Sequence, residues 1–172
     1  MVALPQMPRA LVVDDEPGPS AELSGALAAH GIEARMAWDR TSALQVLTDS
    51  IGPIDVIVVD LCMPGGEALV QTVRTMGGER DLPIVALVGS AESGDPQLRM
   101  NRSVRKCEGP EHVAEVVAAL VGLARHAAEA AARAAEAAAL AADAAARTTA
   151  SEEGSAGRAL GKITLARRLR EA

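Results

Sequence analysis

Three short aliphatic runs that recur before residue 90 constrain the fold more than any other feature of the chain. They lie within residues 9–15, 54–60 and 82–90, and each is rich in valine or isoleucine. Runs of this length and composition predict β-strands, and strands that are apolar on both sides are typical of parallel sheets with both faces covered. The sequence therefore favours a parallel sheet packed between helices.

The segments between these runs have the apolar spacing of helices. Two weaker strands are predicted at 32–37 and 101–106, and helices are predicted at 20–31, 41–49, 66–76 and 110–124. Strands that alternate with helices predict an α/β domain. We therefore expect residues 1–124 to form one open, doubly wound domain around a five-stranded parallel sheet.

Composition excludes several classes of protein. The chain has 172 residues, 49% of them hydrophobic, so it can bury a core, and its formal charge of −6 argues against a general nucleic-acid binder. Cys62 and Cys107 match neither a disulfide scaffold nor a zinc site, so we expect free thiols and a cytoplasmic protein. No stretch is predicted to be a secretion signal or a membrane span.

Three aspartates follow two of the predicted strands. Asp14 and Asp15 come directly after the first run, and Asp60 ends the run at 54–60. The carboxyl ends of parallel strands meet at one edge of a sheet, where α/β proteins bind ligands. Carboxylates gathered there would repel one another unless a hard cation such as Mg²⁺ lay among them. Single Asp pairs after strands are more often turn formers or helix caps, but two strand ends together favour a metal site.

These aspartates belong to a longer set of motifs. They are LVVDDEP at 11–17, VVDLCMPGG at 58–66 and LPIVALVGSA at 82–91, followed by Lys106 and by GPEHVAEVV at 109–117. Over residues 8–124 this order resembles the receiver domain of bacterial two-component response regulators. The resemblance implies a flavodoxin-like sheet with the strand order 2-1-3-4-5.

The resemblance also implies a function. A histidine kinase or phosphotransfer protein would donate a phosphoryl group to Asp60, and the signal would pass to a downstream protein partner. Asp15 would bind Mg²⁺ directly and Asp14 through water, while Asp60 and the backbone carbonyl of Cys62 would supply further oxygens. Lys106 would pair with the phosphoryl oxygens, as a compact charge suits this task; the plainer interpretation is a surface lysine. At most, the chain would catalyse its own aspartyl phosphorylation and dephosphorylation.

Several positions depart from the receiver pattern. Val88 stands where the family has a Thr or Ser, so Ser90 is the candidate substitute for that hydroxyl. Ser103 replaces the switch aromatic, and Cys107 replaces a proline, so we expect a trans bond after Lys106. These departures leave a second hypothesis open, a phosphorylation-independent pseudoreceiver that acts as a docking or assembly module.

Past the domain the sequence changes character. Residues 125–147 are rich in alanine, the strongest helix former, and a helix from about Pro110 to Arg147 would be ~55 Å long and project from the domain. We favour a solvated spacer; a partner-docking helix or a weak homodimer stays open. Residues 148–172 are expected to form a flexible linker (148–161) and a short basic amphipathic tail (162–172). Neither has the apolar residues of a DNA-binding output domain.

Overall fold

The protein is described by a computed structural model that covers residues 7–48, 53–76, 82–89 and 98–168, with side chains described up to residue 144 and at Arg147. The chain divides into two compact units, Met1–Arg125 and His126–Ala172. The first unit contains the sheet and the predicted site.

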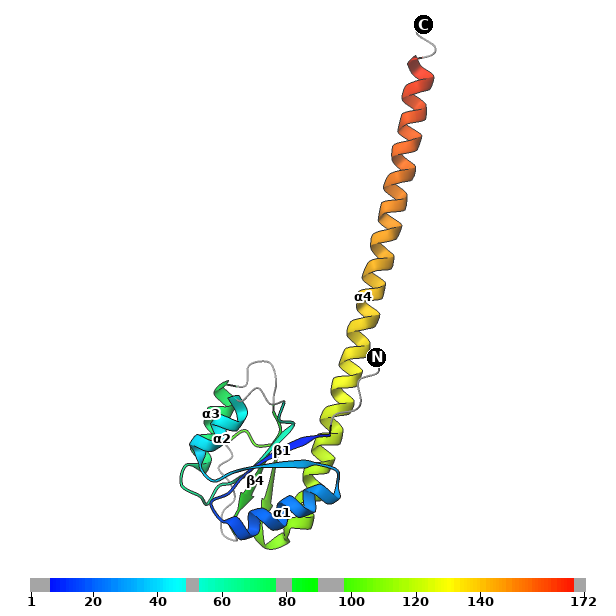
Figure 1. Cartoon of the computed structure of the whole chain (residues 1–172). Helices are drawn as coiled ribbons and strands as arrows, with labels where there is room; N and C mark the ends of the chain where they lie inside the picture. Colours follow the sequence, from blue (N-terminus) through cyan, green and yellow to red (C-terminus); the bar gives the residue numbers. More distant parts are fainter. Residues whose placement is uncertain (1–6, 49–52, 77–81, 90–97, 169–172) are drawn as a thin grey trace. The chain divides into compact units, whose positions relative to one another are not determined.

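Five parallel strands form a single sheet in the order β2-β1-β3-β4-β5 (Figure 1). They are β1 (Arg9–Val13), β2 (Glu33–Ala37), β3 (Val56–Asp60), β4 (Ile84–Val88) and β5 (Arg102–Arg105). Every residue of β3 and β4 is buried, as expected for central strands that are covered on both faces. The predicted fold class and strand order are confirmed.

The helices form two layers, one on each face of the sheet. They are α1 (Pro17–Ala29), α2 (Arg40–Thr48), α3 (Gly66–Met76) and α4 (Pro110–Arg168), and a 3₁₀ helix, η1, covers Lys106–Glu108. Leu23 and Leu27 of α1 pack with Val113 and Val117 of α4 over alternate strand residues. On the other face, α2 and α3 cover the intervening residues of the strands. The alternating directions of strand side chains thus divide the core into two clusters.

Helix α1 begins earlier than the expected residue 20. Its first turn contains Pro17, which suits this position because no backbone N–H is needed there. The helix ends near Gly31, which has a positive φ of 70° and donates from its backbone N–H to the carbonyl of Ala28. The strand before it also ends earlier than predicted, at Val13, so Asp14 and Asp15 lie in the connection between β1 and α1.

Arg74 of α3 connects this helix to the amino-terminal side of β4 and β5. Its guanidinium donates to the carbonyl oxygens of Arg99 and Leu82, both at 2.6 Å, and to Asn101 Oδ1 at 3.0 Å. The same Asn101 oxygen accepts the backbone N–H of Ile84 at 2.8 Å. One side chain therefore holds three segments that are separate in the sequence.

Helix α4 continues to Arg168, so residues 148–161 are helical where the sequence favoured a flexible linker. The difference has a physical reason: the three glycines in this stretch each cost about 1 kcal/mol in a helix, but the good helix formers Ala, Glu, Arg and Leu make up half of its residues. The expected boundaries of the extension and tail stay predictions. Across the described residues, no helix combines the length and apolar character that a bilayer crossing requires.

Candidate functional site

Three carboxylates meet at the carboxyl ends of β1 and β3. One oxygen each from Asp14, Asp15 and Asp60 lies within 4.8 Å of the other two. Asp14 is 2% and Asp60 is 1% exposed, whereas Asp15 is exposed to solvent. The strand ends that the sequence predicted to converge are therefore brought together by the pairing of β1 with β3.

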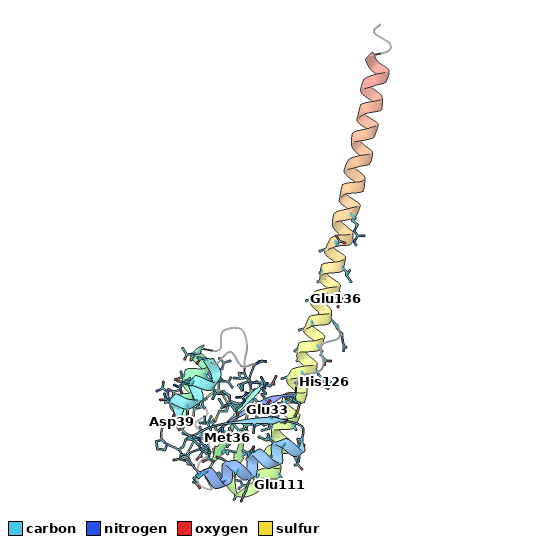
Figure 2. All side chains as sticks on the ribbon, viewed as in Figure 1. Glu33, Met36, Asp39, Glu111, His126 and Glu136 are labelled. Atoms are coloured by element: carbon cyan, nitrogen blue, oxygen red, sulfur yellow. The ribbon has the colours of Figure 1, made fainter. Side chains whose placement is uncertain are left out.

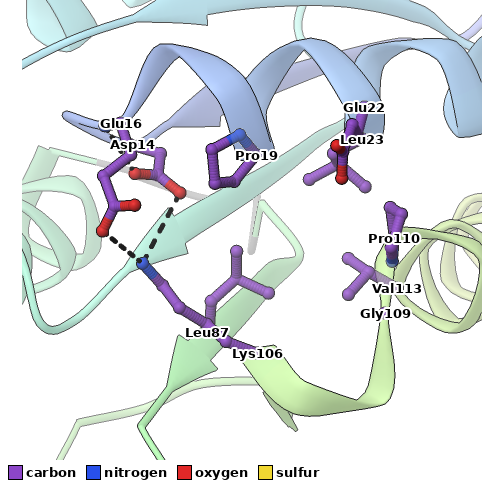
Figure 3. Close-up of a pocket in the computed structure, with 10 residues that line it drawn as sticks. All are labelled: Asp14, Glu16, Pro19, Glu22, Leu23, Leu87, Lys106, Gly109, Pro110 and Val113. Carbon is purple, nitrogen blue, oxygen red and sulfur yellow. Dashed lines mark hydrogen bonds and ion pairs between the residues drawn. The ribbon is translucent and has the colours of Figure 1, made fainter.

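Lys106 brings a positive charge to the two buried carboxylates. It follows β5 as the first residue of η1, and its Nζ lies 2.7 Å from Asp60 Oδ2 and 3.7 Å from Asp14 Oδ2. A third carboxylate, that of Glu16, lies 3.8 Å from the same nitrogen. Figure 3 shows the lysine reaching between the carboxylates of Asp14 and Glu16.

Backbone N–H groups fix the second oxygen of each buried aspartate. Cys62 donates its N–H to Asp60 Oδ1 at 2.9 Å, and Glu16 donates its N–H to Asp14 Oδ1 at 2.9 Å. Each contact spans two residues and forms the local turn that aspartate favours after a strand. Both side chains are therefore held with their other oxygen, Oδ2, directed to Lys106.

Burial and neighbouring charges shift the pKa values of Asp14 and Lys106. Burial raises the pKa of Asp14, helped by the negative charges of Asp60 and Glu16, and the Glu16 N–H and Lys106 only partly offset the effect. Burial lowers the pKa of Lys106, but its hydrogen bond to Asp60 and the charges of Asp60 and Asp14 outweigh burial, so the net shift is upward. Lys106 is thus a firmly protonated cation in an excess of negative charge.

Gly66 allows the chain to pass close to Asp60. A Cβ atom at this position would stand 2.3 Å from the Asp60 carbonyl oxygen and 3.1 Å from the Leu61 Cα. The preceding Gly65 has a φ of 85°, a conformation that favours glycine. The pair of glycines therefore lets α3 begin directly beside the end of β3.

The aspartate cluster has the donors that a hard divalent cation needs. Mg²⁺ and Ca²⁺ bind carboxylate and carbonyl oxygens, and Mg²⁺ is usually held by one or two carboxylates with water. Asp14, Asp15 and Asp60 supply such oxygens at one point, and Asp15 leaves the point open to solvent. The carboxylates therefore fit the predicted ion. The role of the Cys62 carbonyl as a further ligand stays a prediction.

The positions that depart from the receiver pattern lie where the sequence placed them. Val88 ends β4 and is 3% exposed, so a buried isopropyl group stands where a hydroxyl was expected. Ser103 is exposed on β5, the bond between Lys106 and Cys107 is trans, and Cys62 and Cys107 are free thiols. Ser90, the candidate substitute hydroxyl, lies outside the described residues.

One neighbour of Lys106 was not predicted. Glu16 belongs to the "DDEP" motif, but the sequence offered no reason to choose it over a solvated acid. It also lines a cavity of about 230 Å³ beside Asp14, together with residues of α1 and the start of α4. The cavity lining is Asp14, Glu16, Pro19, Glu22, Leu23, Leu87, Lys106, Gly109, Pro110 and Val113 (Figure 3).

Comparison with solved structures identifies the fold. The Vibrio cholerae chemotaxis protein CheY4 is 24% identical, covering 67% of this chain and 99% of its own, with a TM-score of 0.57. A response regulator receiver domain protein from Clostridium thermocellum is 20% identical, covering 71% and 97%, with a TM-score of 0.59. NtrX from Brucella abortus is 22% identical, covering 73% of this chain but only 29% of its own, with a TM-score of 0.64. No protein family model and no curated protein sequence matches the chain. The strand order and the similarity to these solved structures show that the domain has the fold of the response regulator receiver (CheY-like) domains.

Proposed function

We propose that this protein is a response-regulator receiver that accepts a phosphoryl group on Asp60 and relays the signal through protein–protein contacts. The observation that carries the proposal is the position of Lys106 Nζ, 2.7 Å from Asp60 and 3.7 Å from Asp14. Lysine and aspartates come from three strand ends that are far apart in the sequence. A merely structural ion pair would not need the additional carboxylates of Asp14 and Asp15 around it.

The chemistry follows from these side chains. An Asp60 oxygen attacks phosphorus, the bond from phosphorus to the donor histidine nitrogen breaks, and an acyl phosphate forms. Lys106 already contacts Asp60, so its ammonium is in place to pair with the phosphoryl oxygens without a large movement. Mg²⁺ bound at the aspartates would supply the remaining positive charge. Burial of Asp60 excludes most solvent from the reacting carboxylate.

The receiver fold supports a histidine kinase or a phosphotransfer protein as the donor, and a cytoplasmic location follows from that partner. The downstream partner would contact surfaces that change when Asp60 is phosphorylated. At most, the protein would catalyse its own aspartyl phosphorylation and dephosphorylation.

A second candidate function is a phosphorylation-independent pseudoreceiver. Val88 and Ser103 favour it, because the buried Val88 has no hydroxyl for a phosphoryl group and the exposed Ser103 has no aromatic ring to move. In this case the aspartate cluster would be a remnant, and the domain would be a docking module whose surface does not respond to phosphorylation.

Titration with Mg²⁺ followed by beryllofluoride separates the two functions. Trp38 directly follows β2 and is 48% exposed, so it lies at the carboxyl ends of the strands. Its fluorescence and the backbone NMR shifts report on this edge of the sheet. The receiver predicts saturable Mg²⁺ binding and a second change with beryllofluoride, and the second change should be lost in Asp60→Asn. A wild-type protein that binds Mg²⁺ but ignores beryllofluoride would favour the pseudoreceiver.

A further inference from the structure

Every residue other than alanine between positions 127 and 147 lies on one side of helix α4. These six residues, which we call the charged stripe, are Glu129, Arg133, Glu136, Leu140, Asp143 and Arg147. Successive members are four, three, four, three and four residues apart, an average of 3.6, so they line up along one side of a helix. The rest of this part of the helix surface is alanine.

The charged stripe is exposed along its whole length. Leu140 is 65% exposed, and Glu136 is exposed in the same part of the helix (Figure 2). Glu129 pairs with Arg133 at 3.4 Å, and Asp143 pairs with Arg147, so the stripe contains two ion pairs within the helix. Each pair has its acid four residues before its base, the order that stabilises a helix.

The order of charges along the stripe is self-complementary about Ala138. Glu129 and Arg147 both stand nine residues from this midpoint, and one is acidic where the other is basic. Arg133 and Asp143 both stand five residues from it and are likewise opposite in charge. We propose that a second copy of this chain packs antiparallel along the charged stripe, with the two-fold axis at Ala138.

The antiparallel arrangement creates two groups of four charges. In each group, Glu129 faces Arg147 of the second copy, and Arg133 faces Asp143 of the second copy. Each charge then has an opposite neighbour along its own helix and another across the interface. A parallel, in-register pair would instead place every charge against its own copy, which is unfavourable. The charges therefore select the antiparallel direction.

Leu140 and alanine supply the apolar part of the interface. Leu140 stands two residues from the midpoint, so the two copies of this side chain are about 6 Å apart along the axis. The alanines beside the stripe permit a close approach of the helices, near the lower end of the usual ~8–10 Å spacing. Glu136 weakens the proposed interface, because it faces Leu140 of the second copy and lies near the Glu136 of that copy.

The association should be weak and sensitive to salt. Exposed ion pairs contribute little individually, and salt at about 0.1 M screens charges beyond ~10 Å. The interface is also small beside the ~1,600 Å² of a standard complex. We therefore expect reversible dimers that are populated at high chain concentration and low ionic strength, independently of Asp60.

Two exchange variants test the register. One exchanges the first pair (Glu129→Arg with Arg133→Glu), and the other exchanges the second pair (Asp143→Arg with Arg147→Glu). Each keeps an ion pair within the helix but puts like charges across the antiparallel interface. Sedimentation equilibrium of the full chain should show dimers for the wild type and about tenfold or more weaker association for each variant alone.

Combining the two exchanges, in a mixture or in one chain, gives the decisive test of the register. An equimolar mixture of the two variants should associate at least as well as the wild type, because all four contacts across the interface become attractive again. A chain with both exchanges should also form homodimers. Glu136→Leu should tighten the dimer, Asp60→Asn should leave it unchanged, and circular dichroism checks that each variant keeps the helix.

Several results would overturn the proposal. They are a wild type that stays monomeric up to about 1 mM chain at low salt, single exchanges that dimerise like the wild type, and a mixture or a double exchange that does not recover. A wild type that stays monomeric but is captured by a different chain through the same residues would show that the stripe has another partner. None of these results bears on phosphorylation of Asp60.

Discussion

The Nζ of Lys106 donates a hydrogen bond of 2.7 Å to Asp60 Oδ2, although the two residues are 46 positions apart. The lysine is in the first turn after β5 and the aspartate is the last residue of β3, with β4 between them. The contact therefore exists because three neighbouring parallel strands end at the same edge. It joins the most buried carboxylate of the site to its one described ammonium group.

Removing that ammonium should make stability depend on divalent cations. In Lys106→Met, Asp60 and Asp14 remain buried without their cation, so the free energy of unfolding should fall by about 1–3 kcal/mol in the absence of metal. Added Mg²⁺ should recover part of the loss and should bind more tightly than to the wild type. Urea unfolding with and without Mg²⁺ measures both effects.

Arg105→Met is the matched control for this change. Arg105 is the neighbouring residue, and its 61% exposed side chain pairs only at 3.5 Å with Glu108. Its loss should change the free energy of unfolding little and should leave the response to Mg²⁺ unaltered. Equal behaviour of the two variants would contradict a specific role of Lys106.

Replacing Asp14 should stabilise the metal-free protein at neutral pH. Burial raises the folded-state pKa of this carboxyl above 3.8, so the folded protein binds a proton more readily than the unfolded chain does. The free energy of unfolding therefore falls as pH rises from 3.8 through the raised pKa, and it stays lowered at higher pH because Asp14 is then buried in its charged form. Asp14→Asn removes this cost and keeps an oxygen for the Glu16 N–H.

The pH profile of thermal unfolding in a chelator checks this sign. The Asn variant should unfold at a higher temperature than the wild type at pH 7, and the difference should shrink as pH falls toward 3.8. A variant that is less stable at pH 7 would mean that the contact with Lys106 outweighs the burial of Asp14.

Gly66→Ala should disturb the site through the backbone. The new Cβ would lie 2.3 Å from the Asp60 carbonyl oxygen, a distance that only movement of backbone atoms can relieve. We expect a loss of about 1–3 kcal/mol in the free energy of unfolding and weaker Mg²⁺ binding. The control is Gly25→Ala in α1, where a Cβ meets nothing within 4 Å and should stabilise the helix by about 0.5–1 kcal/mol.

Arg74→Met should destabilise the domain without altering the site. The variant loses hydrogen bonds to the carbonyls of Leu82 and Arg99 and to Asn101, and we expect a cost of about 2–3 kcal/mol. Arg74→Lys should lie between the variant and the wild type, because an ammonium cannot reproduce the planar fork. Denaturant midpoints measure the cost, and Mg²⁺ affinity should stay at the wild-type value. A Met variant as stable as the wild type would show that these contacts contribute nothing.

The strands and the three aspartates could be predicted from the sequence because their pattern depends on strand ends alone, whereas the role of Lys106 was predicted from the resemblance to receiver domains. Runs such as Val56–Asp60 are buried on both faces and could be recognised without tertiary information. Some helix and strand ends differ from the predicted ends by a few residues: α1 begins at Pro17 and β1 ends at Val13. Caps and prolines decide such ends, and the apolar pattern alone does not locate them.

Other contacts could not be read from the sequence. Glu16 contacts Lys106 only because the loop after β1 turns back over Asp14, and Arg74 finds its carbonyl acceptors only once β4 and β5 are in place. A flexible linker was expected at 148–161 because of its composition. The structure has a helix there, because the segment is part of the long helix α4 and its conformation depends on the whole run of neighbours. These features depend on loop conformation and on long-range order rather than on local residue patterns.

Incubation with a small acyl phosphate and Mg²⁺, followed by intact-mass and peptide mass spectrometry, tests the central proposal most directly. We predict one added phosphoryl group on the peptide that contains Asp60, labile as an acyl phosphate is, and absent from Asp60→Asn and from samples with a chelator. An unmodified wild type under saturating conditions, or the same modification in the Asn variant, would contradict the account.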